Sequence, residues 1–398
     1  DAAIRYLVVC LVGWELCIRD RGRRGGRGAG AGQGGPGTAV VLCYAVLIAM
    51  FHSLGLIIRR LSFLLVLPLL ACGGGGNGGS SPGGPSGPSA PGHTLLVTVF
   101  YDENGNGQVD ELEGVRIPGV DVVVGLGSGT TQPASGQATV TSNLEGSHNV
   151  MLRSESLPAY FQAAEPIPVQ VPGSAEVFYP VSLPIGGNNA NRYLGYGDSI
   201  TAGEGSSDGN GYTLLLEGRL GPYLGRAEVI EWGRSGDSSI ENAEVATKTL
   251  RWFDPAYTLI LLGTNDWHDS RCQDLPATSC FTIEALRSIV LDVKGWQSLP
   301  ILGTLPPVNP ALAPQGRNEW VDDMNVAIQA LAREQGVPVA DIIAAFRAQG
   351  SLSSLFVDDV HPNDAGYDVI AEAWFDAITR SRSASSSKRG RFDFSIGR

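Results

Sequence analysis

The feature that most constrains the fold is an alternation of short apolar stretches with amphipathic segments between about residues 190 and 380. Apolar residues recur at helical spacing in the amphipathic segments, for example at Val321, Met324, Ile328 and Leu331. This alternation predicts an α/β fold with a parallel sheet covered on both faces. The strands expected are Tyr193–Tyr196, Glu228–Trp232, Leu259–Leu262, Pro300–Leu305 and Val337–Ala340.

Short polar motifs follow the first three of these strands, and a fourth precedes the last predicted helix, Asp364–Ile378. Functional side chains of parallel sheets lie just beyond the carboxyl ends of the strands, so the motifs are expected to converge at one edge. Each motif alone is compatible with ordinary turn chemistry. The motifs are Gly197-Asp198-Ser199, Ser235-Gly236-Asp237, Gly263-Thr264-Asn265-Asp266 and Asp358-Asp359-Val360-His361.

Taken in this order, the four motifs resemble the Ser, Gly, Asn and His blocks of the GDSL/SGNH hydrolase family. The resemblance covers essentially all of residues 190–380 and implies a flavodoxin-like three-layer α/β/α fold. It also implies a carboxylic ester hydrolase that needs no cofactor for catalysis. Serine is a weak nucleophile without a general base, which agrees with a serine and a histidine among the motifs.

The resemblance assigns a role to each motif. Ser199 would be the nucleophile, His361 the base and Asp358 the group that orients the imidazole. Asp359 is the competing carboxylate, but the family's D-x-x-H spacing selects Asp358. The oxyanion hole would consist of the backbone N–H groups of Ser199 and Gly236 and the side-chain amide of Asn265.

Several activities fit these residues. We expect an exported esterase acting on short acyl chains, and a carbohydrate O-acetylesterase is the closest alternative. Lysophospholipase and thioesterase activities would use the same residues. A surface adhesin with a degenerate hydrolase domain is the alternative from a different class, and the presence of Ser199 and His361 argues against it.

Residues 94–184 have a different pattern, with short alternating apolar segments separated by turn residues. No long helical period occurs there, so we expect a small β-sandwich. The predicted strands are Leu96–Tyr101, Val120–Val124, Gln137–Thr141 and Val169–Val171.

A twelve-residue segment after the first of these strands has the pattern D-x-[DN]-x-[DN]-G-x5-E. Its oxygen-bearing side chains suit calcium, which prefers hard oxygen ligands. With the GVRIPGVDVVV that follows, the segment resembles calcium-binding B-type repeats of bacterial surface adhesins. A turn that binds nothing is the alternative, and a bound calcium would be structural. The candidate ligands are Asp102, Asn104, Asn106, Gln108, Asp110 and Glu113.

The N-terminal region indicates export. Residues 1–49 are interpreted as upstream translated sequence or an extension, and residues 50–72 as a signal peptide ending in a lipobox-like Leu69-Leu70-Ala71-Cys72. Cys72 would then carry the lipid. Cleavage near Ala71 without lipidation, or a membrane span over residues 38–58, are the alternatives. Residues 73–93 read as a flexible Gly/Pro/Ser linker and 381–398 as a disordered tail.

The distribution of charged residues and cysteines limits the kinds of molecule that the protein is expected to bind and the compartment in which it is expected to act. The net charge is −12, and eight of the 28 basic residues but only three of the 40 acidic ones lie in residues 1–72, so the remainder is more acidic still. Such a surface disfavours nucleic acid. We expect a monomer outside the cytoplasm that meets small or polymer-linked esters and touches a membrane only through a lipid. Cys272 and Cys280 suit a disulfide in that setting, and His268 is expected on a surface loop.

Overall fold

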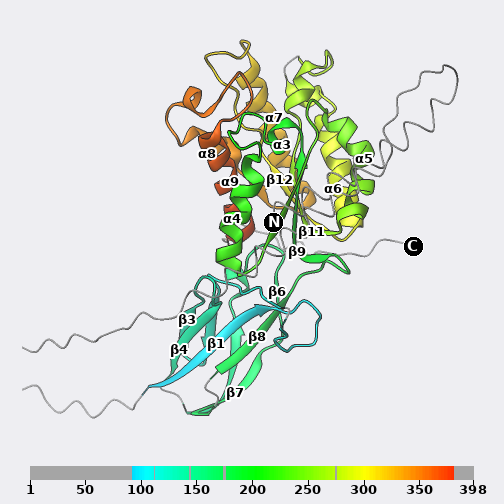
Figure 1. Ribbon diagram of the computed structural model, residues 1–398. Helices are drawn as coiled ribbons and strands as arrows, with labels where there is room; N and C mark the ends of the chain where they lie inside the picture. The colour runs from blue at the N-terminus through cyan, green and yellow to red at the C-terminus, as the bar shows by residue number, and fades with distance from the viewer. Residues whose placement is uncertain (1–91, 112, 143–144, 174–175, 274–275, 381–398) are drawn as a thin grey trace, which may run out of the picture. The chain divides into compact units, whose positions relative to one another are not determined.

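The computed structural model describes residues 92–111, 113–142, 145–173, 176–273 and 276–380 (Figure 1). The described residues belong to one compact unit by their contacts. The interpretations of residues 1–49, of the signal segment with Cys72, of the linker up to residue 91 and of the tail 381–398 concern residues outside the described part. No helix within the described ranges has the length and apolar character needed to cross a membrane.

The first part of the described chain forms two four-stranded sheets. One has the order β4-β1-β8-β6 and the other β3-β2-β5-β7. β1 begins at His93, the last residue of the predicted linker and three residues before the predicted strand Leu96–Tyr101. It pairs antiparallel with β4 and parallel with β8. The strands are β1 His93–Tyr101, β2 Asp121–Val124, β3 Gly127–Thr130, β4 Gln137–Ser142, β5 Gly146–Leu152, β6 Gln162–Ala163, β7 Ile167–Val171 and β8 Glu176–Ser182.

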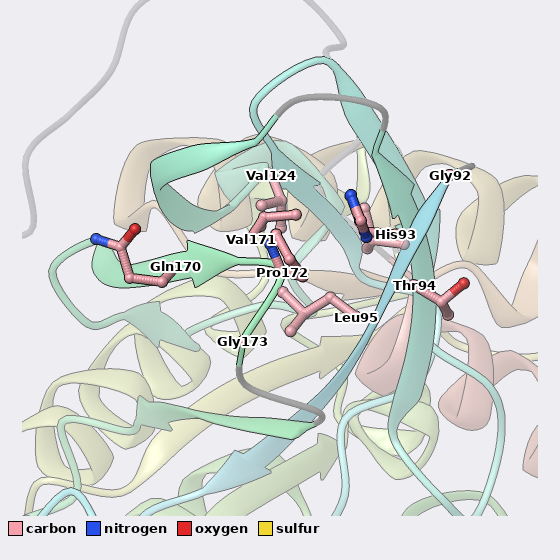
Figure 2. A pocket seen from close by; sticks show the side chains of 10 residues that line it. Gly92, His93, Thr94, Leu95, Val124, Gln170, Val171, Pro172 and Gly173 are labelled. Atoms are coloured by element: carbon pink, nitrogen blue, oxygen red, sulfur yellow. The ribbon is translucent and has the colours of Figure 1, made fainter. Parts of the chain in front are cut away.

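Alternating side chains of these sheets are buried, among them Val97, Val99, Val122 and Val140. This alternation is the burial pattern of strands that cover a core with one face. Four of the strands coincide with the predicted ones, whereas β3, β5, β6 and β8 were not predicted. At one end a cavity of about 340 Å³ opens between the start of β1 and the end of β7, lined by residues that include Leu95, Val124 and Val171 (Figure 2).

The second part contains a five-stranded sheet of order β10-β9-β11-β12-β13, parallel throughout. In chain order this is 2-1-3-4-5, the flavodoxin-like arrangement, so the predicted α/β fold is confirmed. Its central strand β11 is buried along its whole length. The strands are β9 Asn189–Gly197, β10 Glu228–Gly233, β11 Pro255–Leu261, β12 Leu299–Gly303 and β13 Val339–Ala340.

Helices cover both faces of this sheet (Figure 1). α4 packs against α9, whereas α5 packs against α6, which in turn contacts α7. α6, for example, buries Ile289, Val290 and Val293 and contacts β12. The helices are α3 Ser199–Ala202, α4 Gly211–Leu224, α5 Ser239–Phe253, α6 Thr282–Gly295, α7 Arg317–Gln335, α8 Ile342–Arg347 and α9 Asp364–Thr379.

The two sets of sheets are joined by polar and aromatic contacts. The Tyr160 hydroxyl donates to the Pro300 carbonyl at 2.6 Å, and the Asn191 amide donates to Glu103 Oε1 at 2.9 Å. The rings of Tyr160 and Tyr257 pack edge to face, with their centroids 6.3 Å apart. One continuous cluster of buried apolar residues extends from the β1 region through the parallel sheet.

Candidate active site

Ser199 is the first residue of α3, and a single residue, Asp198, separates it from the end of β9. The preceding Asp198 caps this short helix, because its Oδ1 accepts a hydrogen bond from the Ile200 N–H at 3.0 Å. The strand can turn into the helix so sharply because Gly197 has no side chain. A Cβ there would lie 2.0 Å from Thr201 Oγ1 and 2.7 Å from the Leu261 carbonyl oxygen. The turn places Ser199 beyond the carboxyl end of the sheet, with 7% of its surface exposed.

His361 and Asp358 lie against this serine. His361 Nε2 is 2.9 Å from Ser199 Oγ, and His361 Nδ1 is 2.8 Å from Asp358 Oδ2. Asp358 Oδ1 also accepts the backbone N–H groups of His361 and Val360, at 2.6 and 2.9 Å. One carboxylate therefore fixes both the ring and the backbone of the histidine. With Nδ1–H donating to Asp358, Nε2 is the acceptor for the serine hydroxyl.

Asp358 is placed so that its charged form is favoured. Burial alone would raise the pKa of this carboxyl, but the hydrogen bonds from His361 and Val360 outweigh burial and lower it. The competing Asp359 points elsewhere, since its Oδ2 pairs with the Arg317 guanidinium at 3.3 Å. An ionised Asp358 suits a group that stabilises a protonated imidazole.

The predicted oxyanion donors lie on neighbouring loops. Gly236 precedes α5 and has φ of +80°, a conformation that glycine adopts without strain. A Cβ at this position would meet no protein atom within 4 Å, so the backbone angle is what requires glycine here. The Asn265 side-chain amide donates to the Asp237 carbonyl at 3.0 Å. This bond ties the Asn265 loop to the Gly236 loop.

Asp266 connects the same two loops and was not predicted as a site residue. Its carboxylate accepts from the Ser239 N–H at 2.8 Å, and from the hydroxyls of Ser239 and Thr282 at 2.6 Å each. Ser239 begins α5 and Thr282 begins α6, so one carboxylate holds two helix starts. Asp266 is completely buried, and burial raises its pKa while these hydrogen bonds oppose the rise.

Arg317 is a second residue that sequence reasoning missed. It is 2% exposed, and besides Asp359 its guanidinium contacts the Thr264 carbonyl at 3.4 Å. Asn309 adds a further link, because its amide donates to the Asp358 carbonyl at 3.0 Å. Both residues brace the Asp358–His361 loop. Their partners lie 53 and 49 residues away along the chain, so no local motif marks them.

The excursion after Asn265 is closed by a disulfide between Cys272 and Cys280, as expected. The Cys280 sulfur lies 3.0 Å from Thr282 Oγ1, the hydroxyl that donates to Asp266. The disulfide is therefore connected, through Thr282 and then Asp266, to the loops that carry the predicted oxyanion donors. His268 is exposed at the end of a 3-10 turn, Thr264–His268.

Asp198 is a buried acid next to Ser199. Burial raises its pKa to about 7, the Ile200 N–H and His361 lower it, and Asp266 raises it. Its Oδ2 is buried without a hydrogen-bond partner among the described residues. This carboxyl thus changes its charge near neutral pH.

The predicted calcium loop forms a compact turn. Asp102 is buried, and its carboxylate accepts the N–H groups of Gly105, Asn106 and Gly107. The carboxylate of Glu113, 3% exposed, accepts from the N–H groups of Glu103 and Asp110.

The remaining candidate ligands lie on the outer side of this turn. The amides of Asn104 and Asn106 both approach Asp110 Oδ2, at 2.5 and 2.9 Å. Gln108 is exposed, and its N–H donates to Asn106 Oδ1. In the described part of the chain, no three His, Cys, Asp or Glu side chains gather in a metal-binding arrangement. The turn therefore brings oxygen-bearing side chains together, but backbone N–H groups engage the carboxylates of Asp102 and Glu113, and side-chain amides engage that of Asp110.

Comparison with known proteins agrees with the motifs around Ser199 and His361. Residues 196–369 match the model of the GDSL-like Lipase/Acylhydrolase family. This part of the chain is a GDSL-like lipase/acylhydrolase domain. The matched range includes the Ser199, Gly236, Asn265 and His361 motifs. The GDSL domain is accordingly a carboxylic ester hydrolase.

Solved structures similar to the GDSL domain come from several sources. An α/β hydrolase from the metagenome of Lake Arreo is 23% identical, covers 48% of this chain and 96% of its own, and has a TM-score of 0.41. A variant of an acetyl xylan esterase from Geobacillus stearothermophilus is 22% identical, covers 49% of this chain and 97% of its own, and has a TM-score of 0.41. A lipase/acylhydrolase from Enterococcus faecalis is 19% identical, covers 48% of this chain and 95% of its own, and has a TM-score of 0.41. The search among curated proteins found no match to the chain.

Proposed function

We propose that the GDSL domain hydrolyses carboxylic esters of short acyl chains with Ser199, His361 and Asp358 as its catalytic groups. The observation that carries the proposal is the pair of contacts at His361. One imidazole nitrogen faces Ser199 Oγ at 2.9 Å and the other faces the Asp358 carboxylate at 2.8 Å. This is the arrangement in which a histidine can accept a serine proton while a carboxylate stabilises its charge.

In the acylation half, His361 Nε2 takes the proton of Ser199 as Oγ attacks the ester carbonyl carbon. The negative charge then moves to the carbonyl oxygen. The backbone N–H groups of Ser199 and Gly236 and the Asn265 amide would stabilise this oxygen, and the bond from Asn265 to Asp237 keeps the amide oriented. When the tetrahedral intermediate collapses, His361 gives the proton to the leaving alcohol.

In the deacylation half, the same groups act on water. His361 Nε2 accepts a proton from the water that attacks the acyl-serine, and the oxyanion donors act again. The proton then returns to Ser199 Oγ, the acid leaves, and the hydrogen-bonded Ser199–His361–Asp358 arrangement is restored. Because Asp358 remains fixed by backbone N–H groups throughout, the imidazole needs no reorientation between the two halves.

The test is hydrolysis of p-nitrophenyl acetate, butyrate, octanoate and palmitate, and of acetylated xylan, by the wild type and Ser199→Ala. We expect acetate and butyrate to be the best substrates. The variant should lose on the order of 10⁴-fold or more in kcat. A preference for palmitate would contradict the short-chain proposal, and a preference for xylan would favour the O-acetylesterase alternative. A Ser199→Ala variant as active as wild type would contradict the nucleophile.

We also propose that the protein acts outside the cytoplasm. The disulfide between Cys272 and Cys280 supports this, because such bonds persist in oxidising compartments and are rare in the cytosol. Lipidation at Cys72 is part of the same proposal. Labelling of the full chain with a radioactive or clickable fatty acid in a bacterial host, beside Cys72→Ala, tests it: the label should depend on Cys72.

A structural calcium ion in the Asp102–Glu113 loop is a separate proposal. The support is an oxygen-rich set of side chains in a tight turn with buried Asp102 and Glu113. If the ion binds to the folded state, thermal unfolding should shift upwards with added calcium and downwards with a chelator. The Asp102→Asn/Glu113→Gln double variant should lose this response. A melting temperature that does not change with added calcium would contradict the proposal and show that the loop is a hydrogen-bonded turn that binds no calcium.

A further inference from the structure

A carboxylate that the proposed mechanism does not use lies beside the catalytic histidine. Glu204 Oε2 is 3.3 Å from His361 Nε2, the nitrogen that faces Ser199 Oγ. The Glu204 side chain is 48% exposed, so its charge reaches both the histidine and the solvent that a substrate must displace. Its position cannot be read from the sequence, since 157 residues separate it from His361.

The main chain of Glu204 is held firmly. Its N–H donates to the Ser199 carbonyl at 3.0 Å, and its own carbonyl accepts the Tyr367 hydroxyl at 2.5 Å. Neither bond involves the carboxylate. A change of the side chain therefore leaves both anchors in place, which allows the carboxylate to be tested without loss of the loop.

The place of Glu204 in the reaction follows from its neighbour. His361 Nε2 must deliver a proton to the oxygen of the leaving alcohol, so that alcohol approaches Nε2 in the transition state. The acyl oxygen instead turns towards the oxyanion donors. A carboxylate in contact with Nε2 therefore borders the alcohol part of the ester.

The charge of Glu204 is not cancelled by the arginines of the neighbouring loops. Arg317 pairs with Asp359, and Arg234 pairs with Asp237 at 2.8 Å. Glu204 meets a positive partner at His361 only when that imidazole is protonated. An alcohol group arriving beside it meets a half-exposed negative charge.

We propose that Glu204 sets a charge preference for the alcohol part of the ester, with cationic alcohols favoured over neutral ones and neutral ones over anionic ones. The inference rests on the proposed function. For a half-exposed carboxylate a few ångströms from the substrate charge, the preference in kcat/KM should be about tenfold for each step. Salt should weaken it, because screening acts on exposed charges.

The experiment compares three acetate esters of similar size by titration of the released acid. They are acetylcholine, its neutral carbon isostere 3,3-dimethylbutyl acetate, and 3-acetoxypropionate. The enzymes are the wild type, Glu204→Gln, Glu204→Lys and the control Glu155→Gln, which removes one exposed acid from the 3-10 turn Ser154–Ser156. Ratios of kcat/KM within one sample cancel any difference in the folded fraction.

We expect the wild type and Glu155→Gln to prefer acetylcholine, Glu204→Gln to lose about tenfold of that preference, and Glu204→Lys to favour the anionic ester. A wild type without charge preference, or a Glu204→Gln variant that retains it, would overturn the proposal. Failure of the proposed function looks different. In that case the wild type hydrolyses none of the three esters, or Ser199→Ala hydrolyses the neutral one as fast as the wild type.

Discussion

Asp266 is fully buried, yet it makes hydrogen bonds to the first residues of both α5 and α6. Because α5 follows Gly236 and Asp266 follows Asn265, this carboxylate sets the spacing between two predicted oxyanion donors. We predict that Asp266→Asn lowers kcat about tenfold or more while KM changes little, since oxyanion contacts form mainly in the transition state. Steady-state kinetics on p-nitrophenyl acetate measures both constants.

A double-mutant cycle separates this positioning role from general destabilisation. If Asp266 acts through the oxyanion donors, its substitution should cost much less in an Asn265→Ala background than in the wild type. Equal costs in the two backgrounds would show that Asp266 only supports the fold. The free energy of unfolding, measured by urea titration, should fall in both backgrounds alike.

Asp198 gives a prediction about pH. Its folded pKa of about 7 exceeds the ordinary value of 3.8, so the folded protein binds this proton more tightly than the unfolded chain does. The contribution of Asp198 to stability should therefore be greatest at low pH, fall as pH rises towards about 7, and be level above that. The slope is on the order of 1 kcal/mol per pH unit.

The isosteric Asp198→Asn variant keeps an N-cap side chain but cannot ionise. Urea unfolding of wild type and variant at pH 5, 6, 7 and 8 should show their difference growing in favour of the variant up to about pH 7. Parallel stability curves would contradict a raised pKa at Asp198.

Residues of the site were predictable where they occur in local motifs. Ser199, Gly236, Asn265 and His361 each follow a strand or precede a helix that the hydrophobic pattern already marks. Glu204 and Arg317 carry no such signal, because their importance depends on which distant loops meet at the sheet edge. Their partners at His361 and Asp359 are brought near only by the fold.

Among the elements, the excursion between β11 and α6 is the one most dependent on a covalent link. The Cys272–Cys280 bond closes a short loop with a sequence separation of 8 residues. By loop-closure entropy, its removal should cost about 2.5 kcal/mol of stability. We predict that Cys272→Ala/Cys280→Ala unfolds at lower urea concentration and also has a lower kcat, because Thr282 next to Cys280 holds Asp266.

The control for this prediction is Thr282→Val, which leaves the disulfide intact but removes the hydroxyl. It should reproduce the loss of kcat with a smaller loss of stability. An unchanged kcat in both variants would show that the segment closed by the Cys272–Cys280 disulfide does not affect the loops that carry Gly236 and Asn265.

A strand was easier to predict from the sequence when its apolar and polar residues alternate regularly, or when all of its residues are buried. All five strands of the parallel sheet were predicted, with bounds that differ from the observed ones by up to four residues at an end. β11 and β12 are buried along their whole length. β3 is Gly-Ser-Gly-Thr and β5 begins Gly-Ser-His-Asn, so neither has an apolar stripe. β8 contains Pro180, which sequence rules count against a strand, and it lies between β1 and β6.

At the scale of the molecule, the sandwich sheets and the GDSL domain share buried contacts. The Tyr160 hydroxyl satisfies the Pro300 carbonyl of β12, and Tyr160 packs edge-on against Tyr257 at 6.3 Å between centroids. We predict that residues 92–380 unfold in one cooperative transition, because separating the two parts would expose this interface.

Differential scanning calorimetry of the wild type should give one peak, whereas two resolved peaks would contradict the prediction. Tyr160→Phe leaves the buried Pro300 carbonyl without its donor and should lower the stability of that transition by about 1–3 kcal/mol. Tyr223→Phe, which removes a hydroxyl outside this contact, is the matched control.

The serine and the histidine that it faces are 162 residues apart in the chain. During synthesis, Ser199 leaves the ribosome long before His361 and the helix α9 that follows it. A nascent chain therefore passes through a long interval in which the proposed nucleophile has been made and its proposed base has not. Under the proposed mechanism, activity begins only when the last strand of the sheet, His361 and α9 have all been made and packed.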